Sequence, residues 1–257
     1  MTATSSGLTV TVLGSSGSHT AAGQVCSGYL VETGTTRLLV DAGNGSTANL
    51  QRFAEFSAVD AVLISHRHVD HCVDLIGMFY ALRFDPTFDR AIPLYAPDEV
   101  VETLTSLLSN DARQALAHVF QHQPVAGGSR HVIGDVDVSF YDSVHPPPTV
   151  SMRFEHETAV LAYSADSAGG DQLVACAADA DVFLCEATWQ GDADAYPSGI
   201  HLTARAAGAI AQRAGVEKLI LTHIAGGLDR HRSLVEAQET FHGPIDVAND
   251  LDIWRVP

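Results

Sequence analysis

The alternation of apolar and polar positions predicts strands first and helices next in the first half of the chain. Short β-rich runs separated by Gly, Ser and Thr turns are found at residues 8–13, 29–32 and 37–41. A helix is predicted at residues 47–56, and the mostly apolar residues 59–65 are typical of a strand buried on both faces. Helical composition follows at residues 73–83, 98–109 and 111–121. The first half therefore predicts a sheet with helices packed against it.

The second half repeats this order after a loop at residues 124–129. Strands are predicted at residues 131–141, 150–154, 159–164, 181–185 and 218–222. Helices are predicted at residues 203–214 and 232–241. Two such halves pack naturally with their sheets face to face. The expected fold class is therefore α/β, a four-layer αββα sandwich with the helices outside.

The composition favours a single compact domain over residues 1–257. The chain is 46% hydrophobic and 18% charged, which is enough apolar material for a substantial core. Residues 1–7 lack the positive charge of a secretory leader, and no apolar run approaches the roughly 20 residues that span a bilayer. The four cysteines form no C-x-x-C pair, which is typical of reduced thiols. We therefore expect a cytoplasmic protein with no membrane partner.

The charge balance restricts the partners further. Fourteen Lys and Arg residues against 31 Asp and Glu residues give a formal net charge of −17. Affinity for a polyanion comes largely from Lys and Arg side chains that displace its counterions, so a long nucleic acid is an unfavourable partner. A small anionic substrate stays allowed, because bound divalent metals would add positive charge locally.

A cluster of metal-binding residue types begins where the predicted strand 59–65 ends. His66, His68, Asp70 and His71 offer three imidazoles and a carboxylate, the donors that suit Zn²⁺ or a similar first-row ion. Alternate residues of an extended segment point the same way, so His66 and His68 can bind one metal together. Asp70 and His71, where the chain turns into a helix, can face a second metal. The alternative is a polar helix start with solvated histidines.

Three further donors follow later strand-like runs at the points where these break into loops: His145, Asp166 and His223. Each has a structural alternative when taken singly. His145 is then a loop residue, Asp166 a helix N-cap and His223 a packed histidine. Together with the cluster, they complete two metal sites.

In order and over nearly the whole chain, these residues resemble the five metal-binding motifs of metallo-β-lactamase-fold hydrolases. The resemblance implies a dinuclear metal centre. The first ion would be held by His66, His68 and His145, and the second by Asp70, His71 and His223. Asp166 would lie between the two ions. The implied cofactors are two divalent metal ions. Zn²⁺ is the first expectation, and the sequence does not choose among zinc, manganese and iron.

Two more segments resemble the phosphodiesterase branch of this superfamily, which includes tRNase Z and cyclic-nucleotide phosphodiesterases. They contain Glu186 and His201, which match the Glu and His motifs of that branch. Taken alone, Glu186 is a solvated loop acid and His201 a residue before a helix. The tRNase Z pattern usually has His before this Glu, whereas Cys185 stands here. This difference favours a relative of tRNase Z over tRNase Z itself.

The spacing between His145 and Asp166 also separates this chain from tRNase Z. Classical tRNase Z carries a long Gly/Pro- and Lys-rich arm between the matching motifs, whereas only 21 positions separate the two residues here. Residues 161–166, 181–186 and 219–223 resemble an actinobacterial group of cyclic-nucleotide phosphodiesterases. The resemblance therefore implies a small phosphodiester substrate, with cyclic AMP as the first expectation, and a homodimer is common among relatives.

The hypothesis that follows is hydrolysis by a hydroxide shared between the two metals, which attacks phosphorus in line with the leaving 3′ oxygen. Asp70 would also steer the nucleophile, while His201, oriented by Glu186, would protonate the leaving group. Three alternatives stay open: a tRNase Z-like RNA endonuclease, a lactonase or thioesterase, and a non-catalytic metal-binding scaffold. The RNA enzyme would lack its arm, the lactonase would not need Glu186 and His201, and a scaffold would be expected to have lost a ligand.

Other candidates near these motifs are interpreted as structural. Residues 14–19 form a Gly/Ser-rich hairpin connection that could touch phosphate but needs no ligand. Asp41 lies in a turn at a strand end near the site and is expected to be structural rather than catalytic. His118 and His122 stand four apart near a predicted helix, and a polar helix face is preferred to a metal pair.

Overall fold

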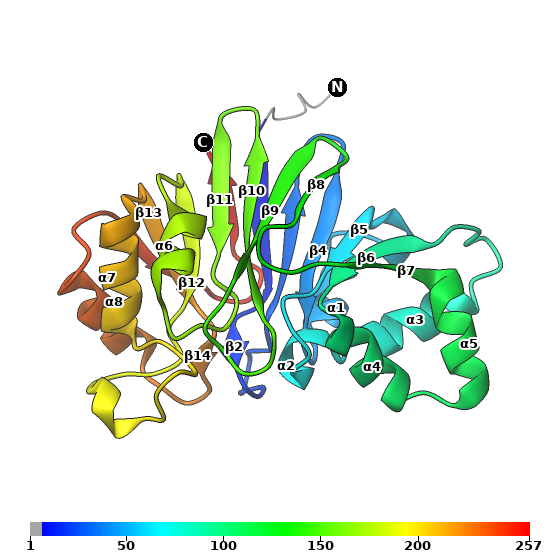
Figure 1. Cartoon of the computed structure of the whole chain (residues 1–257), viewed down its shortest axis with the longest axis horizontal. Coiled ribbons are helices and arrows are strands. Elements are labelled where there is room, and N and C mark those ends of the chain that lie inside the picture. Colours follow the sequence, from blue (N-terminus) through cyan, green and yellow to red (C-terminus); the bar gives the residue numbers. More distant parts are fainter. Residues whose placement is uncertain (1–6) are drawn as a thin grey trace.

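Two seven-stranded sheets form the centre of the computed structural model, which describes residues 7–257 (Figure 1). The first sheet has the order β16-β1-β3-β4-β5-β6-β7. Its strands are β1 (Leu8–Gly14), β3 (Gly28–Glu32), β4 (Arg37–Ala42), β5 (Ala61–Leu63), β6 (Ile92–Ala96), β7 (Phe120–Pro124) and β16 (Ile253–Val256). Strands β4 to β7 run parallel, whereas β16, β1, β3 and β4 alternate in direction.

The second sheet has the order β15-β13-β12-β11-β10-β9-β8. Its strands are β8 (Arg130–Ile133), β9 (Val136–Asp142), β10 (Val150–His156), β11 (Ala159–Tyr163), β12 (Val182–Glu186), β13 (Lys218–Thr222) and β15 (Ile245–Val247). Strands β11, β12, β13 and β15 are parallel. A small third sheet joins β2 (Ser16–Gly17) to β14 (Ile224–Ala225).

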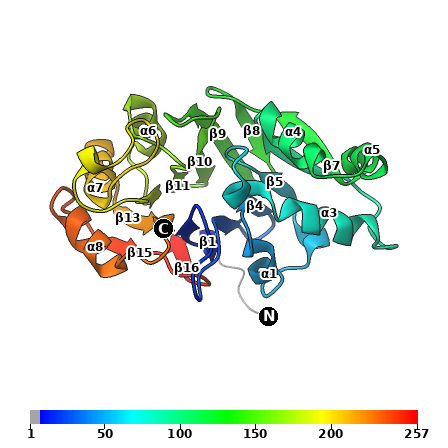
Figure 2. The same ribbon diagram turned by 90° about the horizontal axis from the view of Figure 1, so that it is seen from below.

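Helices lie on the outer face of each sheet, so that four layers follow one another (Figure 2). The helices on the side of the first sheet are α1 (Ser46–Leu50), α2 (Val69–Cys72), α3 (Leu75–Arg83), α4 (Asp98–Ser106) and α5 (Asn110–Val119). The helices on the side of the second sheet are α6 (Asp171–Ala177), α7 (Ala204–Ala214) and α8 (Arg230–Gln238). The predicted αββα sandwich is confirmed.

Strand β5 shows why its sequence is apolar throughout. Successive side chains of a strand point to opposite faces of the sheet. Ala61 and Leu63 face the core between the two sheets, while Val62 packs into the layer formed with the helices around Phe79. All three are fully buried, and burial of one large apolar side chain is worth about 1.5–3 kcal/mol. This buried strand fixes the start of the loop that carries His66.

Several predicted elements were wrong in their bounds. The helix expected at 47–56 ends at Leu50, because turns bring Ala54 and Phe56 onto the same apolar cluster without continuous helix. The helix expected at 111–121 ends at Val119, and Phe120 begins β7. The strand expected at 131–141 is a hairpin, β8 and β9, which turns at Gly134 with a φ of +63°.

Elements that the pattern did not predict lie mostly at the sheet edges. Strand β7 is the edge of the first sheet, where one side needs no partner and a polar sequence with a terminal Pro124 is tolerated. Strands β15 and β16 are also edges, and β6 and helix α6 are short. Among residues 7–257, no helix has the length and apolar character to cross a membrane. All four cysteines are buried and unpaired.

Candidate metal centre

The candidate site lies where strands from both sheets end (Figure 1). The loop after β5 and helix α2 carry the cluster that begins at His66. His145 follows β9, Asp166 follows β11 and His223 follows β13. Because the carboxyl ends of parallel strands meet at one edge, residues more than 150 positions apart come together there. The structure thus gathers all seven donors that the sequence singled out.

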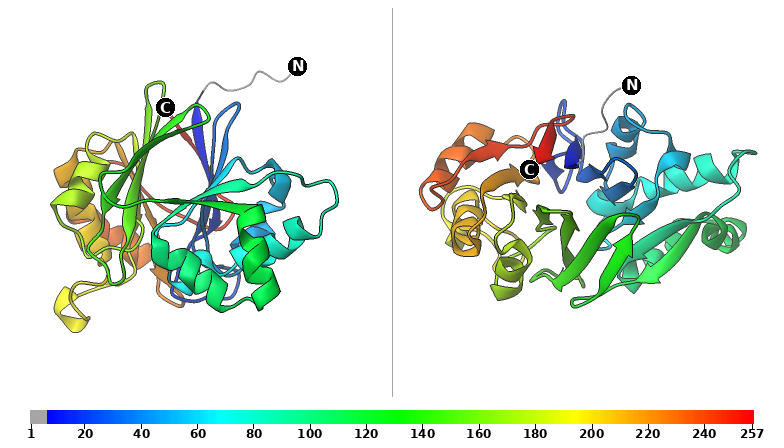
Figure 3. Two further views of the ribbon diagram at one scale, coloured as in Figure 1. Left: turned by 45° about the vertical axis from the view of Figure 1, so that its right-hand side comes forward. Right: turned by 90° about the horizontal axis from the view of Figure 1, so that it is seen from above.

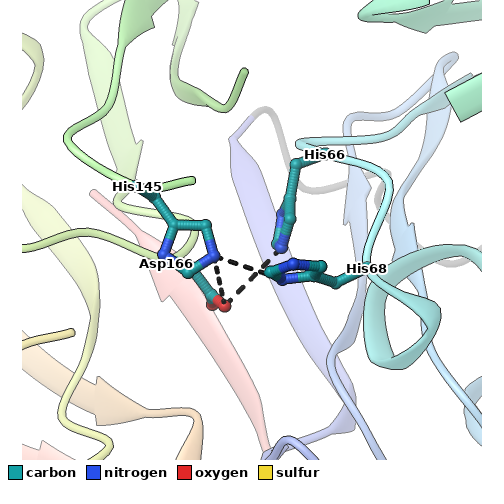
Figure 4. Close-up of side chains that lie close together, drawn as sticks. All are labelled: His66, His68, His145 and Asp166. Carbon is teal, nitrogen blue, oxygen red and sulfur yellow. Dashed lines mark hydrogen bonds and ion pairs between the residues drawn. The ribbon is translucent and has the colours of Figure 1, made fainter. Parts of the chain in front are cut away.

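The donors form two sets with Asp166 between them, and Asp166, His201 and His223 make a third group that could hold a metal ion. His66, His68, His145 and Asp166 each offer a ligand atom within 4.8 Å of the others. Their side chains point toward one another (Figure 4). Asp70, His71 and His223 form a second set with the same spacing. Asp166 Oδ2 lies 3.6 Å from both His66 Nε2 and His145 Nε2. Asp166 Oδ1 lies 3.1 Å from His71 Nε2 and 3.3 Å from His223 Nε2, so one carboxylate oxygen faces each set.

The hydrogen bonds around the rings show that this donor set fits cations. His145 Nδ1 donates to the carbonyl oxygen of Ile200 at 2.8 Å, so the Nε2 of the neutral ring carries a lone pair. That lone pair faces His68 Nδ1 at 3.2 Å. Two ligands of one tetrahedral zinc ion, each at about 2.1 Å, lie about 3.4 Å apart. Converging imidazole nitrogens at this separation are suited to sharing a metal ion.

Two buried atoms of the cluster give independent support for the same fit. Within residues 7–257, His66 Nε2 and Asp166 Oδ1 have no hydrogen-bond partner although both are removed from solvent. An unsatisfied buried polar atom costs about 1–3 kcal/mol, and more when it is charged. A cation held by the first set would satisfy His66 Nε2, and a cation held by the second set would satisfy Asp166 Oδ1.

The pKa shifts of three histidines suit metal binding, whereas the shift of His71 has the opposite direction. Burial lowers the pKa of His66 well below its usual range and lowers the pKa of His68 and of His145. These rings therefore stay neutral, which is the form that binds metals. For His71, burial opposes protonation, but three neighbouring carboxylates, Asp166 first, raise its pKa well above the usual value. The negative charge of these carboxylates thus favours a cation within the cluster.

A buried carboxylate outside the donor sets orients His71. Asp41 Oδ2 accepts hydrogen bonds from His71 Nδ1 and from the Tyr163 hydroxyl, both at 2.7 Å. Its Oδ1 accepts from the backbone N–H of Ser65, also at 2.7 Å. Because Nδ1 is held in this way, His71 Nε2 faces the cluster. Asp41 itself adopts a φ of +55°, uncommon for a residue other than glycine.

His223 has a comparable partner in the second half, where its Nδ1 lies 2.8 Å from the Thr188 hydroxyl. Asp41 was predicted to lie near the site as a structural residue, whereas the sequence predicted no role for Tyr163 or Thr188. Tyr163 ends β11 and Thr188 follows the end of β12, so a position at a strand end is the signal that the sequence offers for both.

Glu186 and His201 lie beside the donors, as the sequence predicted for a pair. His201 Nδ1 is 2.9 Å from Glu186 Oε1 and 3.8 Å from Asp166 Oδ2. Glu186 is 1% exposed, and it also accepts hydrogen bonds from the backbone N–H of Ser167 and from the Thr188 hydroxyl. Burial opposes protonation of His201, but its hydrogen bond to Glu186 outweighs burial and raises its pKa. The hydrogen bond to Glu186 therefore favours the protonated ring, which is the form that can donate a proton.

The loop at residues 14–19 also reaches the cluster. Ser16 and Gly17 pair with Ile224 and Ala225, and the backbone N–H of Ser18 donates to Asp70 Oδ2 at 2.9 Å. The loop is therefore more than a hairpin connection, because it holds one of the donors.

A hollow in the surface lies next to two of the donors. Exposed Arg67 and Val69 line a hollow of about 330 Å³ with Thr103 of α4, next to His68 and Asp70.

His118 lies on α5 but His122 lies on β7, where its Nε2 is hydrogen-bonded to the carbonyl of Ala96 at 3.0 Å. The prediction that both histidines lie on one polar helix face is therefore wrong, because His122 belongs to a strand.

Two sheets with outer helices and a His/Asp cluster at one edge define a class of metal-dependent hydrolase. Residues 36–224 match the family model described as "Beta-lactamase superfamily domain", and the chain belongs to this superfamily. The predicted superfamily and the predicted hydrolase class are both confirmed.

The similar proteins cover nearly the whole chain. An uncharacterized protein from Mycobacterium leprae is 36% identical over 242 residues, which are 92% of this chain and 84% of that protein. The probable metallo-hydrolase YhfI from Bacillus subtilis is 30% identical over 251 residues and covers 96% and 99% of the two chains. The crystal structure of YhfI superposes with a TM-score of 0.86 over 96% of this chain and 98% of its own, at 27% identity. A ribonuclease Z from Halorubrum lacusprofundi is 26% identical and covers 97% of both chains.

Proposed function

We propose that this hydrolase is a dinuclear phosphodiesterase that cleaves 3′,5′-cyclic nucleotides, with cyclic AMP as the first candidate. The observation that carries the proposal is the buried Glu186, whose carboxylate holds His201 next to the donor sets. Cleavage of a phosphodiester expels an alkoxide, and a positioned acid that protonates it contributes about 10²–10⁴-fold. The raised pKa of His201 suits this role.

The proposed division of labour follows the geometry of the donors. One ion would be held by His66, His68 and His145, a second by Asp70, His71 and His223, with Asp166 between them. Bound ions would neutralise charge on the phosphoryl oxygens and lower the pKa of the attacking water. Asp70, whose Oδ2 is held by Ser18, would orient that water. His201 would then protonate the leaving 3′ oxygen, and Glu186 would keep its ring in place.

A small substrate is supported by the chain between His145 and Asp166. This segment forms only the hairpin of β10 and β11, which pair residue by residue from Met152 to His156. Nothing in the hairpin resembles a basic arm, and the net charge of −17 opposes a polyanion. A cyclic nucleotide carries one negative charge and avoids both difficulties.

RNA cleavage is the second candidate, because a relative named ribonuclease Z covers 97% of both chains. One panel of assays separates the candidates. The metal-loaded protein is given bis(p-nitrophenyl) phosphate, cyclic AMP, cyclic GMP, a pre-tRNA and an acyl lactone. Turnover of the cyclic nucleotides is the expected result. Cleavage of the pre-tRNA without cyclic nucleotides would favour the endonuclease, and lactone hydrolysis alone would overturn the phosphodiesterase.

A further inference from the structure

An aromatic pair stands beside the candidate acid and has no place in the proposed chemistry. Trp189 follows the end of β12, and Tyr196 lies in the loop that leads to His201. Their ring centroids are 4.5 Å apart and the ring planes differ by 6°, so the two rings are stacked face to face. Both side chains are partly exposed. Trp189 and Tyr196 therefore form a partly exposed aromatic stack.

The pair is anchored at its base rather than carried on a loose loop. The backbone N–H of Trp189 donates to the carbonyl of Leu202, and the Trp189 carbonyl accepts from the N–H of Ala204. These two hydrogen bonds hold the Trp189 backbone against the segment that follows His201. The Tyr196 hydroxyl donates to the carbonyl of Gln190 at 2.9 Å. Beyond these anchors, residues 192–195 and 197–199 are exposed, and this segment projects from the body of the molecule (Figure 3, yellow).

The position of Trp189 relative to His201 indicates what the pair faces. The His201 ring contacts the rings of His145 and His223 at centroid distances of 5.2 and 5.5 Å. It contacts Trp189 at 5.2 Å, with the planes at 87°. His201 therefore lies between the donor sets and the aromatic pair. A leaving group that takes its proton from His201 lies on the side of the site where the pair is found.

We propose that Trp189 and Tyr196 bind the base of the nucleotide substrate by stacking. This inference rests on the proposed function and specifies which part of the substrate the protein recognises outside the phosphate. A cyclic nucleotide offers one charge and one aromatic base, and stacking of a base on an aromatic side chain is tolerant of sequence and strong. Loss of such a stack changes affinity by about 5- to 150-fold.

The fluorescence of Trp189 tests the contact directly and without turnover. The chain has two tryptophans, and the other, Trp254 on β16, packs against the core between the sheets. In the Trp254→Phe variant, emission reports on Trp189 alone. We expect 5′-AMP to quench it in a saturable way and ribose 5-phosphate, which has the same phosphate but no base, to leave it unchanged. Equal responses to both probes, or none to 5′-AMP at concentrations that inhibit the enzyme, would overturn the proposal.

Kinetics with Tyr196 variants separate stacking from a merely structural role. Tyr196→Ala tests stacking more sharply than a Trp189 variant would, because Trp189 contacts the His201 ring. In the described part of the chain, the Tyr196 ring contacts Trp189 and not His201. We expect KM for cyclic AMP to rise at least fivefold with kcat nearly unchanged, and Tyr196→Phe to restore it. The abasic analogue of cyclic AMP should be hydrolysed equally by all three proteins. Equal losses for both substrates would show that the pair only supports the loop.

Tyr80→Ala is the matched control, since Tyr80 also stacks, on Phe84, but on helix α3. It should leave both substrates unaffected. If the unaltered protein hydrolyses no cyclic nucleotide, the proposed function fails, while the fluorescence experiment with 5′-AMP still decides whether the pair binds a base.

Discussion

The two halves of the molecule supply the site in different ways. The first half gives four donors within six residues, from His66 to His71, on one loop and the short helix α2. The second half gives one residue per strand end, His145, Asp166 and His223, and adds the Glu186 and His201 pair. The donors of the first half are neighbours in the sequence, whereas those of the second half come together only when the parallel strands are aligned. Glu186 and His201, the proposed acid–base pair, both come from the second half.

The largest expected effect comes from removing the donor that joins the two contributions. Asp166 faces both sets with one oxygen each, so Asp166→Ala should lose both metals and reduce kcat/KM at least about 1,000-fold, since the metals contribute several kcal/mol. His66→Ala removes a donor from one set only and should retain close to one metal per chain. Metal analysis by mass spectrometry and turnover of bis(p-nitrophenyl) phosphate check this. Two metals per chain in Asp166→Ala would contradict the shared position.

The second prediction separates metal binding from proton donation. His201→Ala should keep both metals and lose about 10²–10⁴-fold in kcat on cyclic AMP, because the leaving oxygen is no longer protonated. A substrate with a better leaving group, bis(p-nitrophenyl) phosphate, should lose much less. Glu186→Gln, which keeps the size of the side chain, should show a smaller loss of the same kind. A variant as active as the parent on cyclic AMP would exclude His201 as the acid.

The third prediction compares the groups that orient a ring in each half. Asp41→Asn alters a carboxylate held by His71, Tyr163 and Ser65, and should lower metal affinity or activity about 10- to 100-fold. Thr188→Val removes the single hydroxyl at His223 Nδ1 and should cost less. Competition with a chelator measures both affinities. The reverse order would mean that the second half controls the metals more tightly than its hydrogen bonds indicate.

The same contrast explains how much the sequence could predict. The buried strand before His66 and the donor spacing after it are local patterns, so the first cluster and the fold class were accessible. Asp41 was placed near the site, but its bonds to His71 and Tyr163 span 30 and 122 positions and depend on two sheets coming together. Edge strands such as β7 were missed because an edge tolerates a polar sequence. The stack of Trp189 on Tyr196 depends on the conformation of the loop between them, which the pattern of apolar and polar positions does not predict.

The smallest effect concerns a contact between the halves far from the donors. Asp135, in the turn between β8 and β9, accepts hydrogen bonds from the hydroxyls of Thr33, Thr35 and Thr36, in the turn between β3 and β4. The slight burial of Asp135 opposes ionisation, but the three hydroxyls outweigh it and lower the pKa to about 2. A depressed pKa stabilises the folded state above the unfolded value of about 3.9, and this contribution is lost as pH falls toward 2. Asp135→Asn should therefore lower the free energy of unfolding at pH 7 by no more than about 1 kcal/mol, because the group is exposed, and it should unfold at a slightly lower temperature. The difference from the parent should shrink at pH 2 to 3 in thermal melts followed by circular dichroism. A gap that stays constant from pH 7 to pH 2 would show that the turns are joined by shape rather than by the charge of Asp135.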